Sequence, residues 1–256
     1  TVKADAYGIG AIKTIEILEK NKCKHFFVAT LEEALLIRKK KKKTILYVLN
    51  GMESNNLLIF KKNNLIPILN SIKEIKLLIK NNNSKNPIKY GLHIDTGLNR
   101  LGISTKELAL FDFTKLKITI LISHLSSADE ITNNYSKIQN KLFKDSFKYF
   151  KDIQYRSLSN SMGIILGKDY HHDLVRPGIS LYGGHFNTRM KSIIKPVICL
   201  KGKVLQIKEV NKNEFIGYNQ TFKTRKKIKI AIIGIGYADG ISRVLSNRGE
   251  VYYKDK

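Results

Sequence analysis

The sequence contains no tryptophan, only two cysteines and only four prolines among its 256 residues. Cys23 and Cys199 lie far apart and form no CxxC pair, which argues against a disulfide framework and a structural zinc site. No apolar run approaches the roughly 18 residues that span a bilayer, and no signal segment is visible. We therefore expect a cytoplasmic protein with reduced thiols, no metal and no membrane partner. Because the sequence begins with Thr1, an export signal upstream of it is left open.

Acidic residues are scarce. There are 21 Asp and Glu against 46 Lys and Arg, and the formal net charge is +25. Such a charge raises the alternative of a nucleic-acid-binding protein. The lysines, however, are spread along the chain among Ile and Asn, as in RKKKKKT and KNNNSKN, without an RNP-type aromatic run, a GXXG loop or a zinc finger. We therefore expect no specific nucleic-acid partner, only a non-specific affinity for polyanions that depends on salt.

Hydrophobic residues make up 43% of the chain, enough for a substantial core. Short apolar runs alternate with longer segments of helical period; the runs include HFFVA (25–29), TILYVLN (44–50), IPILN (66–70), IKYGLHID (88–95) and ITILISHLS (118–126). This alternation is typical of βαβ units and a parallel sheet. At least six repeats without a Gly-rich dinucleotide fingerprint favour a (β/α)8 TIM barrel. The opening residues TVK are predicted to be the end of a truncated first strand.

The alternation of predicted strands and helices ends at about Pro196. Strand-like segments follow, with turn residues between them and no obvious helix: VICLKGKVLQIKEV, FIGYNQTF and KIKIAIIGIGYADG. We therefore predict a barrel domain over residues 1–195. A mainly β C-terminal domain is predicted to begin at 196–256 and to be incomplete.

Reactive side chains recur where the predicted strands end: Lys3, Tyr7, Arg100, His124, Ser161 and Arg176, with Gly178 and Ile179 close behind. In a TIM barrel these positions meet at one mouth. A lysine amine held there suits a Schiff base, while the Ser161 hydroxyl and the backbone N–H groups near Gly178 suit a phosphate. Together they indicate pyridoxal phosphate as a cofactor.

Six segments resemble the signature motifs of the alanine racemase family, in order and spacing: VKADAYG, HIDTGLNRLGI, SHLSSADE, VRPGISLYG, IGYNQTF and IGIGYADGISR. The resemblance covers the whole chain. It implies a TIM barrel that carries pyridoxal phosphate, followed by a β domain, in a head-to-tail homodimer with shared active sites. The implied activity is interconversion of L- and D-alanine, which supplies D-alanine for peptidoglycan. Because the family extends further in both directions, the chain resembles a fragment lacking both ends.

The resemblance also implies roles for the matched residues. Lys3 would form the aldimine with the cofactor and act as one of two bases, and Tyr218 would act as the other in the partner subunit's site. Arg100 and Tyr237 would face the substrate. The remaining residues would bind the cofactor: Tyr7, Ser161, Gly178 and Ile179 at the phosphate, Arg176 at the pyridine nitrogen, and Arg100 and His124 in the polar network around it.

Three positions depart from the family's pattern. Ile9 replaces a histidine, and Asn219 replaces a glycine after Tyr218, where asparagine still tolerates positive φ. His93 stands where several members carry a modified lysine that supports Arg100, so a carbamate is impossible there. Arg100 must therefore be oriented in another way.

Two alternatives within pyridoxal phosphate chemistry stay open. One is a racemase of broader specificity. The other is a cofactor-binding homeostasis protein without turnover, although such proteins lack the β domain and the tyrosine base. Amino-acid decarboxylases with a similar barrel place a carboxylate at the pyridine nitrogen, and Arg176 at that position argues against them.

Overall fold

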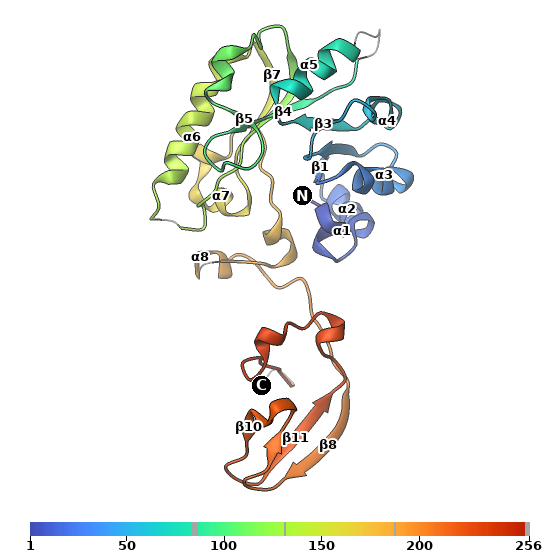
Figure 1. Ribbon diagram of the computed structural model, residues 1–256, viewed down its shortest axis with the longest axis vertical. Coiled ribbons are helices and arrows are strands. Elements are labelled where there is room, and N and C mark those ends of the chain that lie inside the picture. The colour runs from blue at the N-terminus through green and yellow to red at the C-terminus, as the bar shows by residue number, and fades with distance from the viewer. Residues whose placement is uncertain (83–86, 131, 187, 254–256) are drawn as a thin grey trace. The chain divides into compact units, whose positions relative to one another are not determined.

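The computed structural model describes residues 1–82, 87–130, 132–186 and 188–253. The chain divides into two compact units, Thr1–Val197 and Ile198–Lys256 (Figure 1). Among the described residues, no helix is both long and apolar enough to cross a bilayer.

The first unit is built on a parallel sheet whose strands follow one another in the order β1-β2-β3-β4-β6-β7. The bounds are β1 (His25–Val28), β2 (Ile45–Val48), β3 (Ile66–Leu69), β4 (Gly91–Asp95), β6 (Lys117–Ile122) and β7 (Asp152–Ser157). A two-residue strand, β5 (Ile103–Ser104), pairs in parallel with the end of β4. Sequential parallel strands that curl in this way form the wall of a barrel.

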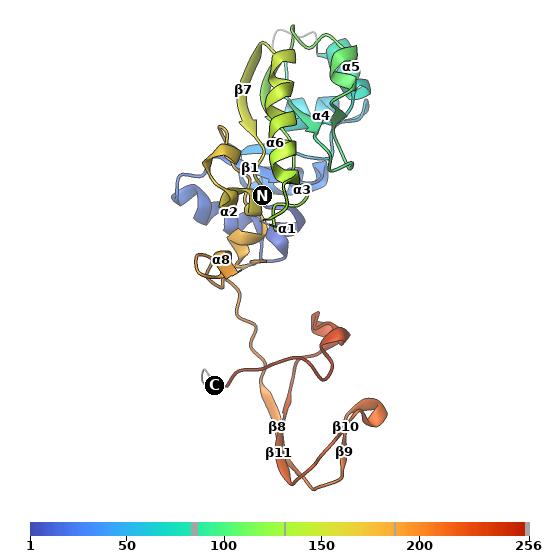
Figure 2. The same cartoon turned by 90° about the vertical axis from the view of Figure 1, so that its left-hand side faces the viewer.

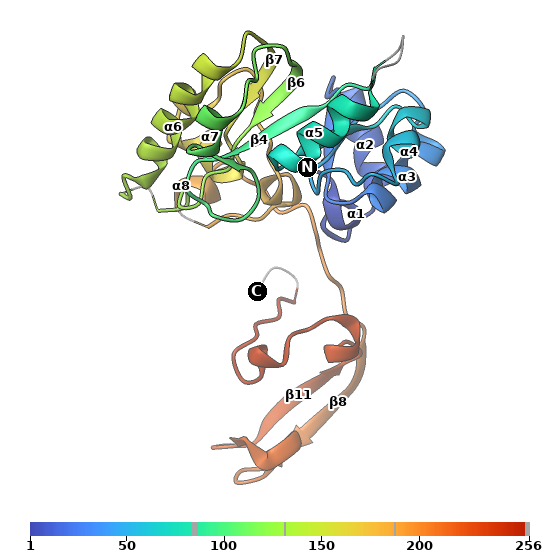
Figure 3. The same ribbon diagram turned by 45° about the horizontal axis from the view of Figure 1, so that its top comes forward.

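Helices connect the strands and cover the outside of the curved sheet: α2 (Ala11–Lys20), α3 (Leu31–Lys40), α4 (Leu57–Lys62), α5 (Ile72–Asn81), α6 (Tyr135–Ser146) and α7 (Ser161–Leu166). In Figure 3, α6 flanks one side of the sheet and α2, α3 and α4 flank the other. Three of these helices begin at side-chain caps, because Thr30, Ser71 and Asn160 accept the N–H groups of Glu33, Glu74 and Gly163.

Backbone hydrogen bonds continue the sheet beyond both edge strands. The N–H of Val2 donates to the carbonyl of Phe27 in β1 (2.9 Å), and the N–H groups of Asp173 and Leu174 donate to Arg156 in β7. The backbone nitrogen of Thr1 donates to the carbonyl of Pro177 (2.9 Å) and joins the two extensions. This ring agrees with the predicted barrel. The predicted first strand is wrong in detail, because Lys3–Tyr7 forms a helical turn, α1, and only Val2 pairs with β1.

Strands β1 to β4 are buried almost throughout on both faces, which explains their nearly continuous apolar sequences. In β1, Phe26 and Val28 belong to the larger cluster, which also includes the buried residues of the helices. Phe27 belongs to a second cluster of six buried residues, with Tyr47, Ile66, Ile68, Ile120 and Ile122. The alternation along β1 shows that the second cluster fills the barrel interior.

The second unit consists of short antiparallel pairs. Strand β8 (Val204–Val210) pairs with β11 (Ile228–Ile233), and β9 (Phe215–Ile216) pairs with β10 (Phe222–Lys223) (Figure 2). Thr224 is its most buried polar residue, with its hydroxyl donating to the carbonyl of Asn211 at 2.5 Å. Many apolar side chains of this unit are exposed, including Leu205 and Ile207. The mainly β character predicted for this part of the chain is confirmed.

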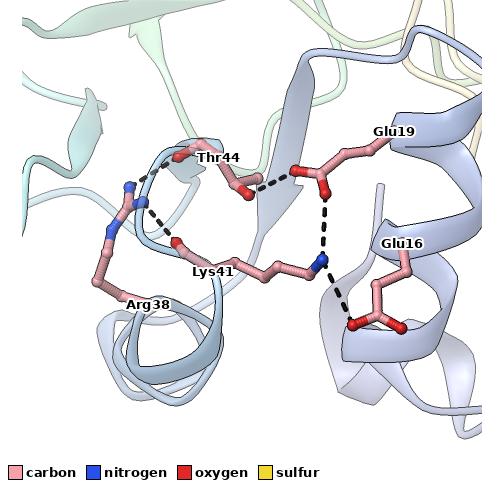
Figure 4. A network of polar contacts seen from close by, with 5 residues as sticks. All are labelled: Glu16, Glu19, Arg38, Lys41 and Thr44. Carbon is pink, nitrogen blue, oxygen red and sulfur yellow. Dashed lines mark hydrogen bonds and ion pairs between the residues drawn. The ribbon is translucent and has the colours of Figure 1, made fainter.

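A network of ion pairs and hydrogen bonds on the outside of the barrel connects α2 to the loop between α3 and β2 (Figure 4). The Lys41 ammonium lies 3.4 Å from the Glu16 carboxylate and 3.2 Å from that of Glu19. The Thr44 hydroxyl donates to Glu19 at 2.7 Å. The buried guanidinium of Arg38 donates to four backbone carbonyls, those of Lys41, Lys42, Thr44 and Asn64. Arg38 thus fixes the loop that Lys41 and Thr44 connect to α2.

Arg38→Ala should lower the free energy of unfolding by roughly 2–4 kcal/mol, because four buried or part-buried carbonyls lose their donor. Urea denaturation followed by circular dichroism measures the change. Lys40→Ala, an exposed position in the last turn of the same helix, is the matched control and should change stability by about 0.5 kcal/mol or less. Equal effects of the two substitutions would contradict a structural role for the Arg38 guanidinium.

Candidate active site

A cavity of about 420 Å³ lies within the first unit, bordered by residues that follow the carboxyl ends of the strands. All eight residues predicted to bind the cofactor line it: Lys3, Tyr7, Arg100, His124, Ser161, Arg176, Gly178 and Ile179. Its volume is in the usual range for small-molecule sites. The carboxyl end of the strands is where barrel enzymes place their active sites.

Lys3 opens a turn with an unusual backbone. The four residues after it, Ala4 to Tyr7, all have positive φ, between 50° and 57°. The Glu33 carboxylate stabilises this left-handed turn, because its two oxygens accept from the N–H groups of Ala4 (2.6 Å) and Ala29 (2.7 Å). A left-handed run of non-glycine residues is strained and persists only where its surroundings fix it. The strain therefore lies beside the predicted catalytic lysine.

Hydroxyl and backbone groups gather on one wall of the cavity. The Ser161 hydroxyl accepts from the N–H of Gly178 at 2.9 Å and from the N–H of Ser180 at 3.3 Å. A Cβ added to Gly178 would lie 2.5 Å from the Tyr7 hydroxyl. Only glycine therefore allows this close approach. Tyr7 itself packs on Tyr182, with ring centroids 4.8 Å apart.

Arg176 is held firmly within the barrel. Its side chain is buried, and Nη1 donates to the carbonyl and hydroxyl of Ser157, at 2.8 and 2.5 Å. Nη2 donates to the carbonyl of Ser123 at 2.5 Å. The guanidinium also lies 5.9 Å from the centre of the Phe27 ring. Burial lowers the pKa of Arg176 to about 10, so the group stays charged at neutral pH.

His124 is oriented by Asn160. The Asn160 amide oxygen accepts from the N–H of Gly163, and its nitrogen donates to the carbonyl of Leu125. The same nitrogen lies 3.4 Å from Nε2 of His124. Nε2 is therefore the acceptor, which places the proton of the neutral imidazole on Nδ1. Burial lowers the pKa of His124 to about 3, helped by the charges of Arg176 and Arg100.

The cavity is basic. Three cationic side chains line it, those of Lys3, Arg100 and Arg176, and no carboxylate is among its described lining residues. Nor do the described parts of the chain contain a group of three or more His, Cys, Asp or Glu that could hold a metal ion. Such a lining suits an anionic ligand with phosphate or carboxylate groups.

Tyr218 and Tyr237 do not line this cavity. They lie in the second unit, on the short 3-10 turns η5 (Tyr218–Gln220) and η6 (Tyr237–Asp239). Both side chains are exposed, Tyr218 by 90%. Asn219 has φ of 57°, so the asparagine adopts the left-handed conformation expected for the glycine that it replaces.

Two residues beside the site, Asn160 and Glu33, could not be predicted from the sequence as parts of it. Asn160 immediately precedes Ser161, and its position as the cap of α7 was the available signal. Glu33, in the first turn of α3, carried the signal of a capping box with Thr30. Neither signal reveals contact with the site, because these contacts join elements that are separated in sequence.

A parallel barrel with a strained lysine turn and a basic cavity at its carboxyl end is typical of barrel enzymes that act on small anionic ligands. The profile of the alanine racemase N-terminal domain matches residues 1–185, and that of the alanine racemase C-terminal domain matches residues 197–256. The chain belongs to the alanine racemase family.

Individual relatives agree with this assignment. Alanine racemase from Rickettsia canadensis is 41% identical over 98% of this chain and 71% of its own length, and that from Rickettsia rickettsii is 40% identical over 100% and 72%. Among solved structures, alanine racemase from Bartonella henselae with covalently bound pyridoxal phosphate has a TM-score of 0.84 and 34% identity, covering 95% of this chain and 70% of its own. The biosynthetic enzyme from Pseudomonas aeruginosa has a TM-score of 0.83 and 27% identity, covering 94% and 69%.

The buried histidines predict a dependence of stability on pH. An unfolded histidine has a pKa of about 6.5, whereas His93 and His124 have pKa values of about 3 in the fold, chiefly through burial. Between these values the unfolded chain binds protons that the folded chain does not. The free energy of unfolding should therefore fall as the pH falls below 6.5, by about 1.4 kcal/mol per pH unit for each histidine.

Urea denaturation at pH 5 and pH 7 measures this difference. His93→Asn should reduce the dependence, whereas His185→Gln, at an exposed histidine, should leave it unchanged. Equal stability of the wild-type protein at both pH values would show that the imidazoles are not held neutral.

Proposed function

We propose that this protein is a pyridoxal-phosphate-dependent alanine racemase that interconverts L- and D-alanine. The observation that carries the proposal is that Lys3, Tyr7, Arg176 and the other predicted cofactor residues line one cavity, whose described lining residues include no carboxylate. Membership of the alanine racemase family supports it over nearly the whole chain.

The residues present fit pyridoxal phosphate. The hydroxyls of Tyr7 and Ser161 lie beside the backbone of Gly178 and Ile179 at one wall of the cavity, where the Gly178 N–H donates to Ser161, and this wall would hold the phosphate. Arg176 would face the ring nitrogen, and Arg100 and His124 would complete the polar surroundings. Lys3 would hold the cofactor covalently through its amine.

Racemisation removes the α-proton from one face of the amino acid and returns it to the other, so it needs two bases. When bound, pyridoxal phosphate withdraws electrons from the α-carbon of the amino acid joined to it. The Lys3 amine would take or give the proton on the face of D-alanine. The Tyr218 hydroxyl would serve the face of L-alanine. Arg100 and Tyr237 would contact the substrate near the entrance.

Arg176 supports racemisation over other reactions. Its guanidinium stays charged and donates to the carbonyls of Ser157 and Ser123, so it is fixed in place and has no proton to release at neutral pH. Beside the ring nitrogen it would leave that nitrogen unprotonated and limit the withdrawal of electrons. This arrangement would restrict transamination and decarboxylation.

The two bases belong to different parts of the chain. We assign cofactor binding to residues 1–195 and the second base to residues 196–256, and we propose that Tyr218 enters the site of a partner subunit in a head-to-tail homodimer. The 90% exposure of Tyr218 supports this assignment, since its phenol is free to contact another surface. We further propose that the enzyme acts in the cytoplasm and supplies D-alanine for peptidoglycan.

A racemisation assay over a panel of amino acids tests the proposed function. Alanine should be the best substrate. Comparable turnover of serine or larger amino acids would favour the broader racemase, and a bound cofactor without turnover of any amino acid would favour the homeostasis protein.

Replacing the predicted lysine should separate cofactor attachment from folding. Lys3→Ala should keep its far-UV circular dichroism yet lose racemisation by about a thousandfold or more, because one base and the covalent link disappear together. Mass spectrometry after borohydride reduction should find the pyridoxyl group of the wild-type protein on Lys3. Lys13→Ala, at an exposed lysine of α2, is the matched control. A pyridoxyl group on any other lysine would overturn the assignment.

The second base can be tested by substitution and by mixed dimers. Tyr218→Phe should lose most racemisation but still exchange the α-proton of D-alanine with deuterium from heavy water, because Lys3 is untouched. Mixed dimers of Lys3→Ala and Tyr218→Phe chains should regain one working site, since both defects fall in the same pocket. Full activity of Tyr218→Phe, or no recovery in mixed dimers, would refute a shared site.

A further inference from the structure

The segment that carries His124 leaves the sheet immediately after β6, which ends at Ile122. Ser123 makes the last backbone hydrogen bond of this edge, because its N–H donates to the carbonyl of Ser157, the last residue of β7, at 3.0 Å. The residues that follow lie outside the strand, so their polar groups need other partners. Three consecutive carbonyls, those of Ser123, His124 and Leu125, accept hydrogen bonds from side chains instead.

The three donors come from different elements. Arg176 donates to the carbonyl of Ser123 and Asn160 donates to that of Leu125, and both of these side chains line the cavity. The third donor, Gln139, belongs to α6 on the outside of the sheet and is not among the described residues that line the cavity. Its side chain is buried, with 0% exposure. A ligand in the cavity would therefore not touch Gln139.

The Gln139 amide pairs with this backbone as a neighbouring strand would. Its nitrogen donates to the carbonyl of His124 at 3.0 Å, and its oxygen accepts from the N–H of Ser126 at 2.9 Å. The oxygen also accepts from the Ser126 hydroxyl at 3.1 Å, whereas the contact of the nitrogen with the Thr96 hydroxyl is long, at 3.5 Å. The two backbone bonds need a donor and an acceptor on one side chain. Glutamine supplies both, which neither a carboxylate nor a methionine of similar length does.

We propose that Gln139 is a positioning residue that holds His124 in the cavity through the backbone on both sides of Leu125. The inference rests on the proposed function, because His124 is assigned there to the polar surroundings of the cofactor. The imidazole lines the cavity beside Asn160, whose side-chain nitrogen lies 3.4 Å from Nε2 of His124. This distance is near the limit for a hydrogen bond, so a small shift of the His124 backbone would break the contact. The neutral imidazole would then lose the restriction that places its proton on Nδ1.

Nitrogen-15 NMR of the imidazoles tests the inference without substrate or turnover. In the wild-type protein at pH 7, the signals of His124, assigned by their loss in His124→Gln, should show the neutral Nδ1–H form. Gln139→Met keeps the length of the side chain but removes its donor and acceptor, so His124 should become a mixture of the two neutral tautomers. Gln139→Asn is one methylene too short to reach both backbone groups and should give the same mixture, which keeps the test decisive if Gln139→Met does not fold. Unchanged His124 signals in the folded variants, or an Nε2–H form in the wild type, would overturn the inference.

Asn140→Leu is the matched control, because it removes a buried amide from the adjacent position of the same helix. Asn140 is 8% exposed; its nitrogen donates to the carbonyl of Asp169 at 3.1 Å, and its oxygen lies 2.9 Å from Nε2 of His172. None of these groups belongs to the His124 segment, so the control should leave the His124 signals unchanged. If Asn140→Leu altered them as much as Gln139→Met, the effect would come from helix packing, and the inference would be wrong.

The kinetics of alanine racemisation measure the consequence for turnover. Gln139→Met should lower kcat by about tenfold or more while changing the KM by about threefold or less, because His124 is displaced and the residues proposed to contact the substrate are untouched. It should add almost nothing to the loss caused by His124→Ala, since both substitutions act on the same imidazole. Additive losses would contradict the inference. If the wild-type protein does not racemise alanine, yet its His124 signals change in Gln139→Met and not in Asn140→Leu, the proposed function fails and the positioning role of Gln139 stands.

Discussion

The position of Lys3 depends on a backbone conformation that L-residues adopt only at a cost of roughly 1–2 kcal/mol each. Four consecutive residues, Ala4 to Tyr7, share it. Glu33 offsets part of this cost, because its carboxylate accepts short, charge-assisted hydrogen bonds from Ala4 and Ala29. The same carboxylate completes the capping box of α3 with Thr30. One side chain therefore fixes the lysine turn, the end of β1 and the start of a helix.

The turn is also fixed across the closure of the barrel. Val2 bonds to β1, Thr1 bonds to Pro177, and the Tyr182 hydroxyl donates to the carbonyl of Thr1 at 2.7 Å. Thr1 and Val2 thus contact β1 on one side and the segment Pro177–Tyr182 on the other, and these contacts form the seam at which the barrel closes. Because Gly178 lies on this seam beside the Tyr7 hydroxyl, the same contacts that close the sheet also assemble the wall proposed to bind phosphate. The contacts that close the barrel therefore also build this part of the site.

The barrel could be predicted from the sequence because strands buried on both faces produce short apolar runs at regular intervals. The gathering of Lys3, Arg100 and Arg176 followed from the rule that strand ends meet at one mouth. The left-handed turn could not be predicted, because Ala, Asp and Tyr carry no preference for positive φ comparable to that of glycine. The partners of the buried histidines were equally hidden. Asn70 reaches His93, and Asn160 reaches His124, each from another strand or loop.

The choice of asparagine beside both histidines has an electrostatic consequence. A carboxylate in the place of Asn70 or Asn160 would favour a protonated imidazole, whereas a neutral amide fixes a tautomer without adding charge. With the imidazoles neutral, the cationic side chains of the cavity are those of Lys3, Arg100 and Arg176. If both imidazoles were protonated, their two positive charges would repel the three cationic side chains. Each imidazole would also lose the lone pair with which it accepts a hydrogen bond. The amides therefore add no charge to a cavity that is already cationic, and they keep both histidines available as acceptors.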